Sequence, residues 1–80
     1  MSEFYLQTGE LSSYALACGY MESVWVDSIH ITLWREHNAY HVEACDHEGE
    51  GILFWDVFDY LAEARKRFRQ AVKEIKKEQA

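Results

Sequence analysis

The fold is decided by residues 29–46, IHITLWREHNAYHVEACD, where two runs of alternating side chains flank a short polar segment. Apolar side chains occupy every second position from Ile29 to Leu33 and again from Tyr40 to Ala44. A period of two is typical of a β-strand with one buried face. Between the runs, Asn38 tolerates the left-handed backbone that a tight turn requires. The stretch therefore predicts a β-hairpin with a two-residue turn at His37-Asn38.

The position of this turn sets the register of the hairpin and separates two faces. It places Leu33 opposite Val42 and Ile31 opposite Ala44 on an apolar face. The other face is mixed, and the same register gives it three cross-strand pairs: Trp34 with His41, Thr32 with Glu43, and His30 with Cys45. We expect the apolar face to be covered by another element of the chain.

The covering element is predicted at the C-terminal end. After a turn at Glu48-Gly49-Glu50-Gly51, residues 52–58 (ILFWDVF) form a third expected strand. Between residues 60 and 77 apolar side chains recur at helical spacing; they are Leu61, Ala64, Phe68, Ala71, Val72 and Ile75. Asp59 stands where an N-cap is expected. We expect Phe58, Leu61 and Phe68 to meet Ile31, Leu33 and Val42 in the core.

Residues 12–22 allow two interpretations. They could form a short helix closed by Gly19, or an opening strand that ends near Met21. Alternation of larger side chains with alanine over residues 14–18 favours the strand. The predicted fold is α+β: an antiparallel three- or four-stranded meander over residues 11–58, with one long C-terminal helix over residues 59–78 packed on one face. Residues 1–80 then form a single small domain.

Composition narrows the classes of protein. Two cysteines, Cys18 and Cys45, are too few for a disulfide framework, and residues 1–4 do not resemble an export signal. No apolar stretch approaches the roughly 18 residues that would span a bilayer. We therefore expect a soluble protein of a reducing compartment, the cytoplasm.

Charge is unevenly distributed along the chain. Residues 1–64 contain twelve Asp or Glu and one basic residue, Arg35, which gives this part a net charge of −11. Residues 65–80 contain seven Lys or Arg and two Glu, and carry +5. An acidic body disfavours nucleic acid over most of the surface, because phosphates require cationic neutralisation.

Three potential metal ligands lie close together in sequence: His41, Cys45 and His47. On a strand, His41 and Cys45 lie roughly 13 Å apart, at about 3.3 Å per residue. One zinc ion cannot bind both, because its bonds are only about 2.0–2.3 Å long. We expect solvated strand and turn side chains here, with no metal and no other cofactor.

Catalysis has one candidate pair, Cys45 as nucleophile with His30 as its cross-strand base. A free cysteine is more often a small buried apolar side chain than a nucleophile. The chain contains no glycine-rich phosphate loop and no nucleophile elbow. We therefore expect a protein that is not an enzyme.

Two surfaces could bind a partner. One is the sheet face away from the helix, with His30, Trp34, His41 and either Trp55 or Phe54; its rings could bind a protein, meet a second copy or cover the edge of the core. The other is an acidic end of the sheet, which could imitate the phosphates of nucleic acid in a basic cleft or be merely a solvated surface. The expected partner-binding residues are Trp34, Glu43, Asp46, Glu48, Glu50, Trp55 and Asp56.

A short acidic meander followed by Phe58-Asp59-x-Leu61-x-Glu63-Ala64 and one amphipathic helix resembles small anti-defence proteins of phages and mobile elements, including some anti-CRISPR proteins. The likeness covers residues 29–77 as a pattern, without a diagnostic motif. It implies binding to a host defence complex, such as a CRISPR effector, and inhibition at its nucleic-acid site. We expect such a protein-binding inhibitor. The alternatives are a nucleic-acid-binding regulator that uses the basic helix and a homodimeric structural accessory protein.

Overall fold

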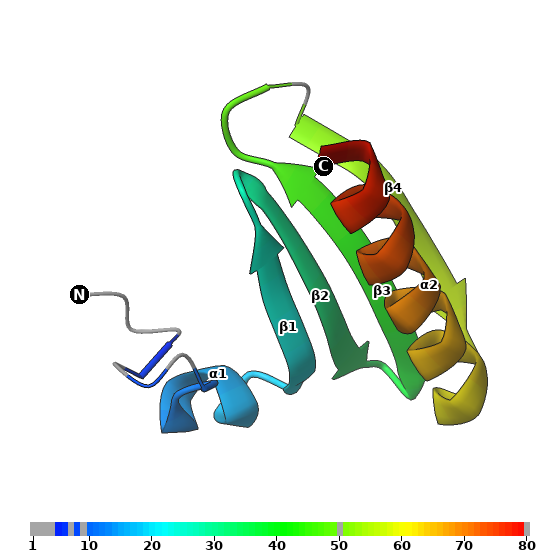
Figure 1. Cartoon of the computed structure of the whole chain (residues 1–80). Coiled ribbons are helices and arrows are strands. Elements are labelled where there is room, and N and C mark those ends of the chain that lie inside the picture. The colour runs from blue at the N-terminus through cyan, green and yellow to red at the C-terminus, as the bar shows by residue number, and fades with distance from the viewer. Residues whose placement is uncertain (1–4, 7, 9, 50, 80) are drawn as a thin grey trace.

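A four-stranded antiparallel sheet with a long helix across one face makes up the protein in the computed structural model, which describes residues 5, 6, 8, 10–49 and 51–79 (Figure 1). The strands neighbour one another in chain order: β1 (Tyr20–Val26), β2 (Ile29–Glu36), β3 (Ala39–Asp46) and β4 (Gly51–Phe58). Helix α1 (Ser13–Ala17) precedes the sheet, and helix α2 (Leu61–Gln79) follows it. The predicted α+β meander with a C-terminal helix is confirmed.

The β2–β3 hairpin has the predicted turn and register. His37 and Asn38 have φ angles of 53° and 62°, the left-handed conformation of a two-residue turn that matches the twist of the strands. Leu33 pairs with Val42 and Trp34 with His41, and the other three expected pairs are also present. One polar dipeptide therefore determines which side chains of two strands share a face.

The preference for a strand over residues 12–18 is wrong, because Ser13–Ala17 form α1. Ser12 caps this helix by accepting a hydrogen bond from the backbone N–H of Ala15, at 3.2 Å. The small Ala15 is buried whereas its larger neighbours Tyr14 and Leu16 are exposed, so their alternation does not mark a strand. The first strand begins at Tyr20 and continues to Val26, beyond the predicted end near Met21.

Helix α2 covers the apolar face of the sheet. It begins at Leu61, two residues after the start of the predicted range 59–78. Its buried side chains meet those of β2 and β3 in one core; they are Ala64, Phe68, Ala71 and Ile75 from α2, and Ile31, Leu33, Val42 and Ala44 from the strands. Leu61 and Val72 are half-buried at the margin of this core. None of the described helices is long and apolar enough to cross a membrane.

Charge contacts attach α2 to the edge strands. The Arg67 guanidinium lies 2.9 Å from the Asp56 carboxylate of β4 and 3.9 Å above the ring of Phe54. Arg65 Nε lies 3.3 Å from Glu22 Oε2 of β1 and forms an ion pair with it. This oxygen accepts no hydrogen bond from the described residues. Basic residues of the tail are therefore paired with acidic residues of the body across the helix–sheet interface.

Candidate interaction surface on the open sheet face

The sheet face opposite α2 carries two groups of rings. The first, the Trp34 cluster, spans all four strands and consists of Tyr20, Trp34, His41 and Trp55. The second, the His30 cluster, lies toward the β1–β2 turn and consists of Tyr5, Trp25, His30 and His47. Alternation along the strands directs these side chains away from the helix-covered face.

The rings of the Trp34 cluster hold one another in place. Trp34 stacks on His41 with ring centroids 5.0 Å apart and an angle of 9° between the planes. The indole N–H of Trp55 donates a hydrogen bond to His41 Nδ1 at 3.1 Å. Trp55 remains 54% exposed. The cluster is thus a preorganised aromatic surface that a partner could cover at little entropic cost.

The strand β4 extends this surface to the edge of the sheet. Trp55 pairs with Glu43 on the open face, whereas Phe54 pairs with Ala44 on the α2 side, so Trp55 is the member of the predicted alternative that joins Trp34. Four large apolar side chains of this strand are exposed: Ile52, Leu53, Trp55 and Val57. β4 contains no lysine or proline, two residues that commonly protect an edge strand from pairing with another chain. None of the described residues pairs with the outer edge of β4.

The His30 cluster is more enclosed. Trp25 stacks on His30 with ring centroids 4.4 Å apart, and the Tyr5 hydroxyl lies 2.6 Å from His30 Nε2. Tyr5 also hydrogen-bonds the hydroxyl of Ser23. Burial, followed by the proximity of His47, lowers the pKa of His30 from 6.5 to about 4, and burial raises the pKa of Tyr5 to about 12. Near the β1–β2 turn, the open face is therefore occupied by the hydrogen-bonded side chains of Tyr5, Ser23 and His30, with His30 and Tyr5 in their neutral forms.

The low pKa of His30 predicts that acid destabilises the fold. The unfolded chain takes up a proton near pH 6.5 and the folded chain only near pH 4, so stability is complete above pH 6.5 and falls between the two. The shift corresponds to at most about 3 kcal/mol, and we expect about 1 kcal/mol because the half-buried ring is screened by solvent. This loss of stability is measured by urea unfolding of the wild type and of His30→Gln at pH 7 and at pH 4.5.

The histidine variant should show a smaller loss of stability on acidification than the wild type. A matched control is His37→Asn, in the exposed β2–β3 turn, which should keep the wild-type dependence. An unchanged pH dependence in His30→Gln would show that acid acts through other groups.

The expected acidic residues do not form one patch. Glu43 lies on the open face between Thr32 and Trp55. Glu48 is exposed in the β3–β4 turn, and Asp46 is used within that turn: its Oδ1 accepts hydrogen bonds from Ser28 Oγ at 2.7 Å and from the Glu48 N–H at 3.0 Å. The first of these bonds is the main cause of the lowered pKa of Asp46.

The remaining two acidic candidates do not join the open face. Asp56 lies on the opposite side of the sheet, paired with Arg67, and Glu50 lies outside the described residues. Figure 1 also shows that the C-terminal end of α2, with Lys76 and Lys77, lies at the same end of the molecule as the β3–β4 turn. The candidate binding groups of the open face are therefore mainly its rings, and its acidic side chains contribute less.

The candidate metal and catalytic residues are divided between the two clusters. His41 belongs to the Trp34 cluster, whereas His47 lies beside Trp25 in the His30 cluster. Within the part of the chain that the structure describes, no three His, Cys, Asp or Glu side chains are grouped as for a metal ion. Cys45 is paired with His30 as predicted, but His30 Nε2 is within hydrogen-bonding distance of both Tyr5 and Ser23.

Sequence reasoning missed several residues of the open face because it missed β1. Tyr20 and Trp25 belong to this strand, and burial together with the Glu43 carboxylate raises the pKa of Tyr20. The period-two pattern Ser23-x-Trp25 was the available signal. Val57, two residues after Trp55 on β4, was likewise predictable as a member of the face.

Comparison with protein-family models, with curated proteins and with solved structures finds no match to this chain. Its class is therefore defined by geometry: it is an α+β protein whose sheet packs against a helix on one face and has a preorganised set of rings on the other.

Proposed function

We propose that this protein is a non-enzymatic protein-binding module that docks its partner on the open sheet face. The observation that carries the proposal is the Trp34 cluster, a stacked and hydrogen-bonded set of rings whose outermost member, Trp55, is more than half exposed. Tryptophan and tyrosine dominate the energetics of protein interfaces because they bury a large area with few rotatable bonds. The exposed apolar edge of β4 adds main-chain groups that a partner strand could pair with.

The charges around the face indicate a basic partner. Glu36 and Glu43 adjoin the Trp34 cluster, and Trp34 Nε1 lies 3.4 Å from Glu36 Oε2. The strands contribute one cation, Arg35, whose position alternates with Trp34 and is therefore on the α2 side. Cationic clefts are characteristic of complexes that handle nucleic acid. We propose such a complex, of the host-defence kind that includes CRISPR effectors, as the target, and occupation of its cleft as the means of inhibition.

The test is affinity capture from a host lysate followed by titration of the captured partner against purified variants. Trp55→Ala should weaken binding at least about tenfold, the effect of losing one interface anchor. Tyr60→Ala removes an exposed ring that directly precedes α2, outside the four strands, and should leave binding unchanged. Glu43→Lys should weaken binding and reduce its sensitivity to salt, because the partner is expected to be basic.

Two results would contradict the proposal. If the purified protein binds nucleic acid and loses that binding when cations of α2 are reversed, it is a nucleic-acid-binding regulator. If the protein alone is a dimer that Val57→Lys converts to a monomer, the face and the β4 edge are an interface between copies of this chain.

A further inference from the structure

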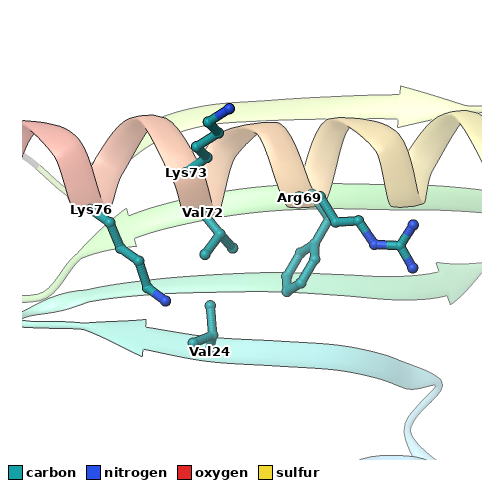
Figure 2. A pocket seen from close by; sticks show the side chains of 6 residues that line it. Val24, Arg69, Val72, Lys73 and Lys76 are labelled. Atoms are coloured by element: carbon teal, nitrogen blue, oxygen red, sulfur yellow. The ribbon is translucent and has the colours of Figure 1, made fainter.

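A groove lies on the side of the molecule opposite the aromatic face, between α2 and the edge strand β1. It has a volume of about 450 Å³ and is lined by three apolar and three basic side chains: Val24, Phe68, Val72, Arg69, Lys73 and Lys76. Figure 2 shows Val24 and Val72 pointing toward each other across the groove, with Lys76 extending from α2 toward β1. The lining contains no acidic side chain.

The groove exists because α2 does not cover the whole sheet. The core side chains of α2 pack mainly on β2 and β3, and β1 is an edge strand of the sheet, so the groove follows the margin of the helix along β1. Val24 is therefore half-buried although it belongs to the apolar face, and Val72 is half-buried on the helix above it. These side chains leave apolar surface that no described part of the chain covers.

The shape of this surface restricts what can occupy it. Phe68 forms part of the lining but is only 7% exposed, and it is the only ring there, so no exposed ring is available for the base stacking that single-stranded nucleic acid requires. The apolar side chains are recessed between helix and strand, whereas a membrane-binding surface presents apolar side chains that protrude. A recessed apolar floor with cations on one side is complementary to an apolar chain that ends in an anion.

We propose that this groove binds a single-chain anionic amphiphile, with a carboxylate or phosphate headgroup near Lys76 and an aliphatic chain that runs over Val24, Phe68 and Val72 toward Arg69. The volume lies in the range of small-molecule sites, about 300–1,000 Å³. Arg69 and Lys76 lie seven residues apart on α2, roughly 10 Å along the helix, with Val72 between them. The site is separate from the open face and does not depend on the function proposed for that face.

Titration of the full chain with decanoate below its critical micelle concentration tests the proposal, with the methyl NMR signals of Val24 and Val72 as the readout. Both signals should shift saturably. Octanoate should bind about tenfold more weakly, because two fewer methylenes are buried. Decyltrimethylammonium, which has the same chain but a cationic head, should not shift them.

Charge reversal on α2 provides matched variants. Arg69→Glu with Lys76→Glu should weaken decanoate binding at least tenfold. Lys66→Glu with Lys77→Glu makes the same change in net charge at exposed positions outside the groove and should leave binding unchanged. All four positions are on the surface of a helix in which glutamate is well tolerated, so both variants should fold.

Three results would overturn the proposal: no shift of the valine signals with decanoate, equal binding of the cationic amphiphile, or equal losses in the two double variants. Stronger binding to vesicles of anionic phospholipid than to decanoate would also overturn it, by showing a membrane-surface role for α2. Trp55→Ala should not alter decanoate binding, so failure at one face is distinguishable from failure at the other.

Discussion

Replacing Phe68 by alanine is expected to destabilise the protein by about 3–5 kcal/mol. Phe68 is buried at the centre of the helix–sheet core, against side chains that include Ile31, Leu33 and Val42. The variant loses the transfer free energy of the ring and leaves a cavity that the rigid sheet cannot fill. An 80-residue domain has a total free energy of unfolding of only about 4–12 kcal/mol. Urea unfolding should therefore show a variant with little or no residual stability at 37 °C.

Tyr60→Ala is the matched control for this prediction. Tyr60 directly precedes α2 and its side chain is 69% exposed, so removal of a ring of similar size there should cost less than about 0.5 kcal/mol. Similar losses in the two variants would mean that α2 does not pack on the sheet through Phe68.

The parts of the fold that sequence alone predicts are those fixed by local chemistry. The left-handed conformations of His37 and Asn38 are a property of the dipeptide, and the register of β2 with β3 follows from them. The buried face of α2 follows in the same way from helical periodicity. In both cases a few neighbouring residues contain the whole signal.

Prediction failed where burial depends on distant elements. The residues of α1 alternate in size like a strand, yet the buried member is the small Ala15, which only the packing of α1 beside β1 selects. Trp55 and Phe54 could not be distinguished, because the register of β4 includes an irregularity between Ala44 and Cys45 that no turn dipeptide announces. The groove beside Val24 depends on where α2 crosses the sheet, which periodicity does not determine.

One error in the predicted site could have been avoided from the sequence. Trp55 and Asp56 are adjacent in a strand, so they face opposite sides of the sheet and cannot belong to one patch. The structure places Trp55 beside Trp34 and Asp56 beside Arg67. Residues that are grouped as a candidate site because of their charge must also lie on the same face of the strand that contains them.

Gly19→Ala is expected to destabilise the protein by about 2–4 kcal/mol. Gly19 ends α1 with a φ of 95°, a conformation that costs an L-residue about 1–2 kcal/mol. A Cβ atom at this position would lie 2.6 Å from the backbone oxygen of Arg35, closer than van der Waals contact permits. The Arg35 N–H donates to the Gly19 oxygen at 2.9 Å, so neither backbone can move without weakening this link between the start of β1 and the end of β2.

Gly51→Ala separates the two causes of this loss. Gly51 has a φ of 79°, but a Cβ atom there would meet no atom of the described residues within 4 Å apart from its chain neighbours, so the conformational cost of about 1–2 kcal/mol is the one that applies. Urea unfolding of both variants should therefore give a difference of at least about 1 kcal/mol, which is the cost of the close contact with Arg35. Equal losses would show that the backbones of Gly19 and Arg35 are not held in contact. The register by which α1 leads into β1 would then have to be set by the burial of Ala15 rather than by this glycine.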